Sequence, residues 1–73
     1  MEHFVDAKYL QCPGPITKLF TKIKEIPSGD IVVIEATDQG FKKDVTAWSQ
    51  KTKNELLSLE EENGVIIAKI RKA

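Results

Sequence analysis

The sequence contains one cysteine, Cys12, and one histidine, His3, in a chain of 73 residues. A single thiol cannot form an internal disulfide, and one cysteine with one distant histidine gives none of the ligand spacings of a zinc site. No metal and no cofactor are therefore expected. A lone cysteine is typical of proteins in a reducing compartment, so the sequence predicts a cytoplasmic location.

The sequence also lacks an excess of charge and a long hydrophobic run. Eleven basic residues balance eleven acidic ones, which gives no electrostatic case for nucleic acid or an anionic membrane as a direct partner. No stretch approaches the roughly 18 apolar residues that a membrane span needs. The N-terminal MEHFVDAKYL has an early acidic residue and no apolar run, so no signal peptide is expected. A chain this short is predicted to form a single domain over residues 1–73.

The first half of the chain predicts a strand, a helix and a second strand. Residues 3–7 alternate apolar and polar side chains, as in a short strand. A helix is expected from Pro13 to the turn around Pro27 and Gly29, and its apolar residues fall on one stripe: Ile16, Leu19, Phe20 and Ile23. Residues 30–36 contain the β-branched run IVVI, which indicates a strand in the interior of a sheet with both faces at least partly covered.

The second half predicts a helix followed by a hairpin. The helix covers about residues 41–53, with four residues on its inner stripe: Phe41, Val45, Trp48 and Thr52. The apolar runs at 55–62 and 65–71 flank Asn63-Gly64, and Asn-Gly between two such runs is the strongest local signal for a hairpin. The acidic residues 60–62 are interpreted as a solvated strand end that discourages edge pairing.

The element order is therefore β-α-β-α-β-β, an α+β fold. Two helices cannot cover both faces of a small four-stranded sheet, so we expect a two-layer α/β sandwich with both helices on one face of a mixed sheet. The first β-α-β unit should be parallel and right-handed. The loops after the first two strands then emerge at the same end of the sheet, which predicts that Cys12 and Asp38 are neighbours.

The segment CPGP, residues 12–15, concentrates the chemistry. Pro13 at the first helical position makes Cys12 the N-cap, and Pro15 stiffens the same turn. Gly14 lacks a side chain, so a partner could approach the turn closely. The partial positive charge of a helix N-terminus stabilises a thiolate, which predicts a nucleophilic sulfur. With no second cysteine to resolve it, such a sulfur suits a carrier that accepts a group and passes it on.

Each of these residues also has a purely structural interpretation. Cysteine is often simply a small buried hydrophobic residue, which would make Cys12 part of the core. Lys18 is less than two turns from Cys12 and could contact the thiolate, but surface lysines are usually only solvated. Asp38 precedes the second helix, where an acidic cap is common. Trp48 lies on an apolar stripe and is assigned to the core.

The segment VDAKYLQCPGPITK resembles the signature of the TusA/SirA-like sulfur carriers, an apolar-Asp pair followed by Cys-Pro-x-Pro at a helix start. The segment DQGFKKDVTAWSQKTKNELL is similar to the second half of that signature. The resemblance implies the same β-α-β-α-β-β sandwich, with the last strand between the second and third and antiparallel to both. Two departures stand out: Tyr9 replaces the usual glycine, and Ser49 replaces a second cysteine found in many relatives.

The resemblance further implies persulfide relay, in which Cys12 takes sulfane sulfur from a desulfurase or a rhodanese-like donor and delivers it to an acceptor protein. Pro13 and Pro15 would form the stiffened helix start, Lys18 a basic position beside it, and Asp38 the acidic residue of the neighbouring loop. Tyr9 either reshapes the first loop or shields the sulfur, because a positive φ at that position would strain tyrosine. The protein is expected to be a monomer that works with partner enzymes.

Two other functions remain open at this point. In the first, the chain is a noncatalytic interaction or regulatory module and Cys12 is structural. In the second, it binds RNA, since a related topology occurs in a translation initiation factor. The balanced charge and the lack of interleaved aromatic and basic residues disfavour RNA binding.

Overall fold

The computed structural model describes residues 2–10 and 14–73. Six elements follow one another in the order predicted: β1 (Glu2–Ala7), α1 (Gly14–Glu25), β2 (Ile31–Ala36), α2 (Gly40–Thr52), β3 (Glu55–Glu62) and β4 (Val65–Arg71). Neither described helix is long and apolar enough to cross a membrane. The predicted bounds of the two hairpin strands are confirmed, as are the ends of the first two strands, and the other described bounds lie within a few residues of the predictions. The helix start predicted at Pro13 lies outside the described residues.

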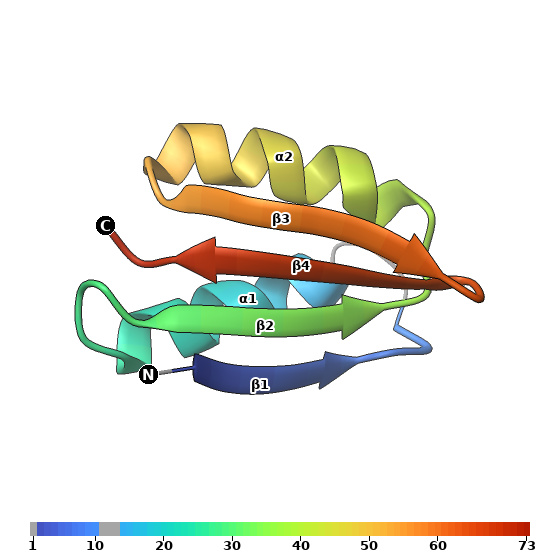
Figure 1. Ribbon diagram of the computed structural model, residues 1–73, viewed down its shortest axis with the longest axis horizontal. Coiled ribbons are helices and arrows are strands. Elements are labelled where there is room, and N and C mark those ends of the chain that lie inside the picture. Colours follow the sequence, from blue (N-terminus) through green and yellow to red (C-terminus); the bar gives the residue numbers. More distant parts are fainter. Residues whose placement is uncertain (1, 11–13) are drawn as a thin grey trace.

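The four strands form one mixed sheet in the order β1-β2-β4-β3 (Figure 1). β1 and β2 are parallel, with Glu2 opposite Ile31 and Ala7 opposite Ala36. β4 is antiparallel to β2 on one side and to β3 on the other. The strand order that the family resemblance implied is therefore confirmed. Because parallel strands need a crossover, α1 connects β1 to β2 across one face of the sheet.

Both helices cover the same face of the sheet, and the core lies between the two layers (Figure 1). Alternate residues of β1, β2 and β4 point into it, as the period of a strand requires, and Leu56 and Leu59 of β3 pack against it from the edge. Among the described residues, those fully buried from water include Ala7, Pro15, Leu19, Val32, Ile34, Ala36, Phe41, Val45, Ile66, Ala68 and Ile70. The predicted two-layer sandwich is thus confirmed.

The buried face of α1 differs from the predicted stripe. Pro15, Leu19 and Ile23 are buried and repeat every four residues, whereas Ile16 is only partly buried. Phe20 is 45% exposed, so its prediction as a buried residue is wrong. The buried residues of α1 lie one position before Phe20, at Leu19 and every fourth residue from it. The centre of the Phe20 ring lies 4.4 Å from the ammonium of Lys24, a cation–π contact.

The buried face of α2 begins as predicted and then diverges. Phe41 and Val45 are in the core, and Trp48 is partly buried against it. The last buried position is Ser49, whose hydroxyl donates to the Thr46 carbonyl at 2.9 Å. Thr52 is exposed, so its place on the inner stripe is wrong. The hydroxyl of Ser49 is satisfied locally, which lets a small polar residue pack against the core.

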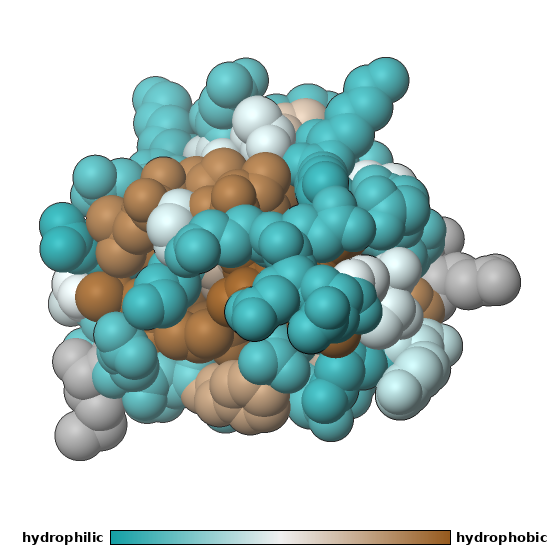
Figure 2. Space-filling view, turned by 45° about the vertical axis from the view of Figure 1, so that its right-hand side comes forward, coloured by the Kyte–Doolittle hydropathy of each residue, from teal (hydrophilic) through white to brown (hydrophobic). Residues whose placement is uncertain are grey.

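The second face of the sheet is covered by no helix among the described residues. Ile31 and Val33 of the central strand point to this open face and are half-buried, while their neighbours Val32 and Ile34 are fully buried. The interior position predicted for this strand is confirmed. Apolar residues gather on this side of the molecule, interrupted by charged side chains (Figure 2). Phe4 of β1 is 58% exposed there.

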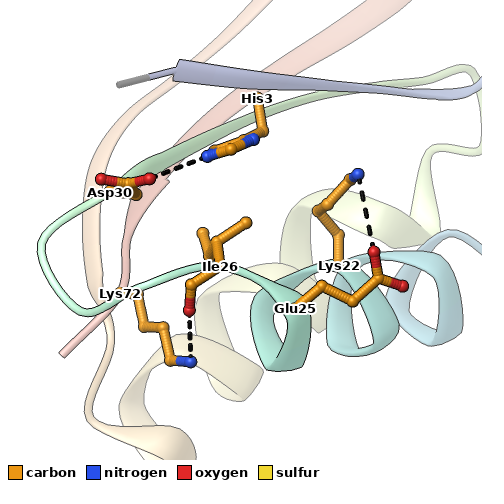
Figure 3. Close-up of polar contacts among 6 residues, drawn as sticks. All are labelled: His3, Lys22, Glu25, Ile26, Asp30 and Lys72. Atoms are coloured by element: carbon orange, nitrogen blue, oxygen red, sulfur yellow. Dashed lines mark hydrogen bonds and ion pairs between the residues drawn. The ribbon is translucent and has the colours of Figure 1, made fainter.

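The end of the sheet where β1 begins and β4 finishes is closed by a chain of hydrogen bonds. Lys72 exchanges backbone bonds of 2.8 Å with Gly29 and Asp30, and its ammonium donates to the Ile26 carbonyl at 2.6 Å (Figure 3). The His3 ring nitrogen Nε2 lies 2.8 Å from Asp30 Oδ2. This bond from His3 holds the pKa of Asp30 below its ordinary value.

Candidate functional site

The predicted site occupies the other end of the sheet, where β1 and β2 finish and α1 starts (Figure 1). Cys12 and Pro13, its predicted centre, lie outside the described residues. The residues on both sides of this gap, up to Leu10 and from Gly14, are described. Their contacts show which elements lie next to the predicted site.

The loops that follow β1 and β2 lie side by side, as the parallel β-α-β arrangement predicted. The backbone N–H of Tyr9 donates to Thr37 Oγ1 at 2.9 Å, and Leu10 N–H donates to the Ala7 carbonyl at 3.4 Å. A shallow depression of about 400 Å³ lies between the two loops, lined by residues of both, including Asp38 and Gln39. The loop bearing Asp38 is therefore next to the loop that leads to Cys12, while the contact between these two side chains stays a prediction.

Tyr9 has φ 68°, in the left-handed region that favours glycine. A non-glycine residue held there costs about 1 kcal/mol. The hydrogen bond to Thr37 holds this conformation, and the side chain is 88% exposed. The predicted strain at this position is therefore confirmed. The phenol extends into solvent at the site end, where it can meet a partner.

Gly14 and Pro15 fix the start of α1 against the rest of the domain. A Cβ added to Gly14 would lie 3.3 Å from the Cβ of Leu10, closer than nearly all such contacts. Pro15 is buried in the core. Glycine at position 14 thus lets Leu10 pack closely on the helix start, a structural role besides the approach of a partner that the sequence suggested.

Lys18 is one turn into α1, and its ammonium donates to the Asp6 carbonyl at 3.2 Å. This bond joins the first turns of α1 to the end of β1, just before the loop that leads to Cys12. An ammonium has three donors, so two remain for another acceptor. The predicted contact between Lys18 and the thiolate stays a prediction, because it involves Cys12.

Asp38 takes the capping role that the sequence predicted. Its Oδ1 accepts from the Gly40 N–H at 3.1 Å, and its carbonyl accepts from the Phe41 N–H at 3.0 Å. The residue directly before α2 is Gln39, whose side chain makes no capping bond. Asp38 therefore satisfies two of the open N–H groups of α2, those of Gly40 and Phe41, from one residue further out.

Glu61 is a residue of this region that the sequence analysis missed. Its carboxylate accepts a hydrogen bond from the Gln39 amide at 2.9 Å and pairs with the ammonium of Lys42. These two donors, Lys42 first, hold the pKa of Glu61 below its ordinary value. The contact joins the end of β3 to the first turn of α2. Only the register of the hairpin, which turns Glu61 to the helix side, could have indicated it.

The described residues contain no group of three side chains arranged to hold a metal ion. The described side chains at this end of the sheet offer hydroxyl, carboxylate and ammonium groups, from Thr37, Asp38 and Lys18.

Comparison with known proteins identifies the family. The sequence model of the family Sulfurtransferase TusA matches residues 3–72. YrkI of Bacillus subtilis, a candidate sulfur carrier protein, is 40% identical over 62 residues, which are 85% of this chain and 83% of YrkI. YrkF of the same organism, also a candidate sulfur carrier, is 38% identical over 68 residues, 93% of this chain and 37% of YrkF.

The chain thus spans little more than a third of the length of YrkF. Among solved structures, a SirA-like protein from Desulfitobacterium hafniense has the same fold, with a TM-score of 0.83 over 97% of this chain and 96% of that protein, at 22% identity. The family model, the relatives and the fold agree with one another. The chain belongs to the TusA family of sulfur carrier proteins.

Proposed function

We propose that this protein carries sulfane sulfur as a persulfide on Cys12, between a donor enzyme and an acceptor protein. The observation that carries the proposal is the family match over residues 3–72, which includes the Cys-Pro-Gly-Pro segment at residues 12–15. The donor belongs to the desulfurase or rhodanese-like class, and the acceptor is a second protein with a thiol.

Loading is a thiol exchange at sulfur. The Cys12 thiolate attacks the outer sulfur of a persulfide on the donor, the donor's S–S bond breaks, and the donor cysteine leaves as a thiolate. The sulfur keeps its proton and ends bound to Cys12. An acceptor thiolate then repeats the exchange and releases Cys12 as a thiolate, so the relay needs no external oxidant or reductant.

The position of Cys12 in the sequence suits both steps. A helix N-terminus lowers the pKa of a cysteine near it, which raises the thiolate fraction for attack and makes Cys12 a better leaving group in delivery. The chain has no second cysteine that could discharge the persulfide by forming an internal disulfide. Tyr9 and Gln39 are exposed at this end of the sheet, beside the loop that leads to Cys12, which is the surface that a donor or an acceptor would approach.

The test is to load the protein with a rhodanese and thiosulfate, or with a cysteine desulfurase and cysteine, and to measure its intact mass. We expect one additional sulfur atom on the native chain, removed by a reducing thiol, and none on Cys12→Ser. The pH–rate profile of Cys12 alkylation should show a pKa below that of a free thiol.

Equal loading of Cys12→Ser would show that the sulfur is bound elsewhere. Slow alkylation with the profile of an ordinary thiol, together with no loading from either donor, would favour the noncatalytic interaction module instead. The cytoplasmic location and the monomeric state are further expectations, to be checked by cell fractionation and by sedimentation.

A further inference from the structure

The open face of the sheet, which points away from α1 and α2, is more apolar than a solvated face requires. A sheet with one face in water alternates apolar residues inward with polar residues outward. Strand alternation and register instead place five apolar side chains on the open face: Phe4, Ile31, Val33, Val65 and Ile67. Phe4 is 58% exposed, and the other four are half-buried. Apolar side chains gathered on an open surface mark an interaction site.

These five side chains form one continuous band across three strands. Phe4 lies opposite Val33 in the parallel pair of β1 and β2. Ile67 on β4 is diagonal to Val33, two positions from the residue directly opposite it. Ile31 and Val65 extend the band along β2 and β4, since both point to the same side as these residues. Brown side chains on this side of the molecule, crossed by charged ones, are visible in Figure 2.

The charged side chains of the open face differ between its two halves. The half where β1 starts has two carboxylates and two cations, from Glu2, Glu55, Lys69 and Arg71. The guanidinium of Arg71 lies 3.2 Å from the Glu55 carboxylate. This half is therefore balanced in charge.

The half next to the predicted site has an excess of carboxylates. Four point outward there: Asp6, Glu35, Glu60 and Glu62. Lys8 Nζ lies 3.6 Å from Glu35, and Lys18 reaches the Asp6 carbonyl from the helix side, so these two cations offset two of the four. Among the described residues, no cation forms an ion pair with Glu60 or Glu62.

The two unmatched glutamates border the apolar band directly. Glu60 lies opposite Ile67, and Glu62 lies opposite Val65. Glu61 between them points to the helix side, where it pairs with Lys42. The open face thus combines an apolar band with negative charge along one border, the border formed by β3.

We propose that an amphipathic helix of a partner protein, with basic residues along one side of its apolar stripe, packs on the open face. The face of a sheet offers no free backbone donors or acceptors, so the partner must satisfy its own, and a helix does so internally. Its apolar stripe would cover Phe4, Val33 and Ile67. Its basic residues would lie beside Glu60 and Glu62, which the charge of this border favours.

The length of the band sets the length of the helix. Ile31 lies opposite Arg71, which is six residues from Val65 along β4, a distance of about 20 Å. Since a helix rises about 1.5 Å per residue, about 14 residues would cover the band.

A second copy of this chain fits the open face less well. Two copies packed face to face would each bring the same excess of carboxylates to the interface, with no further cation to offset it. The charge of the face thus favours a basic segment of a different protein.

The probe for the test is a blocked helical peptide of about 14 residues, with a leucine stripe flanked by lysines. It is titrated into isotopically labelled Cys12→Ser protein, so that the result does not depend on sulfur chemistry. We expect shift changes at the outward residues of β1, β2 and β4, and none on α1 or α2. A peptide with glutamates in place of the lysines should bind about tenfold more weakly, and added salt should weaken binding of the lysine peptide.

Two variants separate the contribution of the apolar band from that of the charge. Phe4→Ala should weaken binding about tenfold, because it removes the ring that the helix would bury. Glu62→Lys should weaken it about fivefold, because it reverses a charge beside the basic residues of the peptide. Glu25→Lys is the matched control: it changes the net charge equally on the exposed surface of α1 and should leave binding unchanged. All three variants should keep the circular dichroism spectrum of the parent.

The proposal is overturned if the lysine peptide fails to bind at millimolar concentration, if its effects map to the helices, or if the glutamate peptide binds as tightly. An equal loss of binding in Glu25→Lys and Glu62→Lys would also overturn it, because the effect would then come from net charge alone. Dimers in sedimentation with contacts on the open face would identify a second copy as the occupant instead. Each of these results leaves the sulfur relay untouched.

Discussion

The two ends of the sheet are held in different ways. At the end where β1 starts, four hydrogen bonds link Lys72 and His3 to the loop between α1 and β2, and the buried Ile26 closes the core. At the end with the predicted site, the described part of the loop after β1 has Tyr9 in a strained conformation, one hydrogen bond from Tyr9 to Thr37 and one from Leu10 to Ala7. Among the described residues, the far end is thus joined by bonds from both terminal segments to the loop between α1 and β2, whereas the site end combines a strained residue with a bond between its two loops.

The largest difference in stability between the two ends is expected from shortening Ile26, the buried side chain at the end where β1 starts. Ile26 is 5% exposed, and Ile26→Ala should lower the free energy of unfolding by about 2–5 kcal/mol because it leaves a cavity. Urea denaturation measures this loss. Sulfur loading of the folded variant should match that of the native chain.

Ile16→Ala is the matched control at the site end, where Ile16 is only partly buried. This substitution removes the same atoms as Ile26→Ala, and it should lower the free energy of unfolding clearly less because Ile16 is already partly exposed. A loss as large as that of Ile26→Ala would mean that both ends contribute equally to stability, which contradicts the comparison.

A smaller effect, of opposite sign, is expected at the site end. Tyr9→Gly removes the strain of φ 68°, and the entropy that glycine adds to the unfolded chain offsets part of the gain, so the net stabilisation should be about 0.5 kcal/mol. Lys53→Gly is the control, because Lys53 has φ 61° at the end of α2, far from this loop in the sequence. Destabilisation by Tyr9→Gly alone would show that the phenol has a packing role that its 88% exposure does not suggest.

The smallest effect concerns pH at the far end. The bond from His3 lowers the pKa of Asp30 in the folded state, so ionised Asp30 stabilises the fold above the unfolded pKa of about 3.9. This contribution is lost as the pH falls through the lowered folded pKa. Thermal unfolding should therefore show Asp30→Asn less stable than the native chain near neutrality, with the difference shrinking in acid. A difference that is constant with pH would assign the effect to packing instead of charge.

The elements were predictable where local signals were strong. Asn63 and Gly64 have φ 53° and 80°, as a tight hairpin turn requires, and the bounds of both flanking strands follow from this turn. The side chain that faces the core on α1 was less predictable. Leu19 and Phe20 are equally apolar, and only the position of the helix on the sheet decides which of them is buried.

The site was predictable in its motif and less so in its contacts. The parallel β-α-β unit correctly placed the loops of Tyr9 and Thr37 together. The bond from Lys18 to the Asp6 carbonyl was not predictable, because every residue offers a backbone carbonyl and no sequence pattern marks it. Lys42 and Glu61 are 19 residues apart, and their contact depends on strand register and helix placement together.

The strand that opens the domain and the strand that closes it have their outer ends on the same side of the molecule, opposite the loops that surround the predicted site (Figure 1). A domain fused to either terminus, or an affinity tag used for purification, would therefore lie at the end where β1 starts. It would leave the end with the predicted site uncovered. Fusions of this fold should consequently be tolerated at both termini without obstructing access to Cys12.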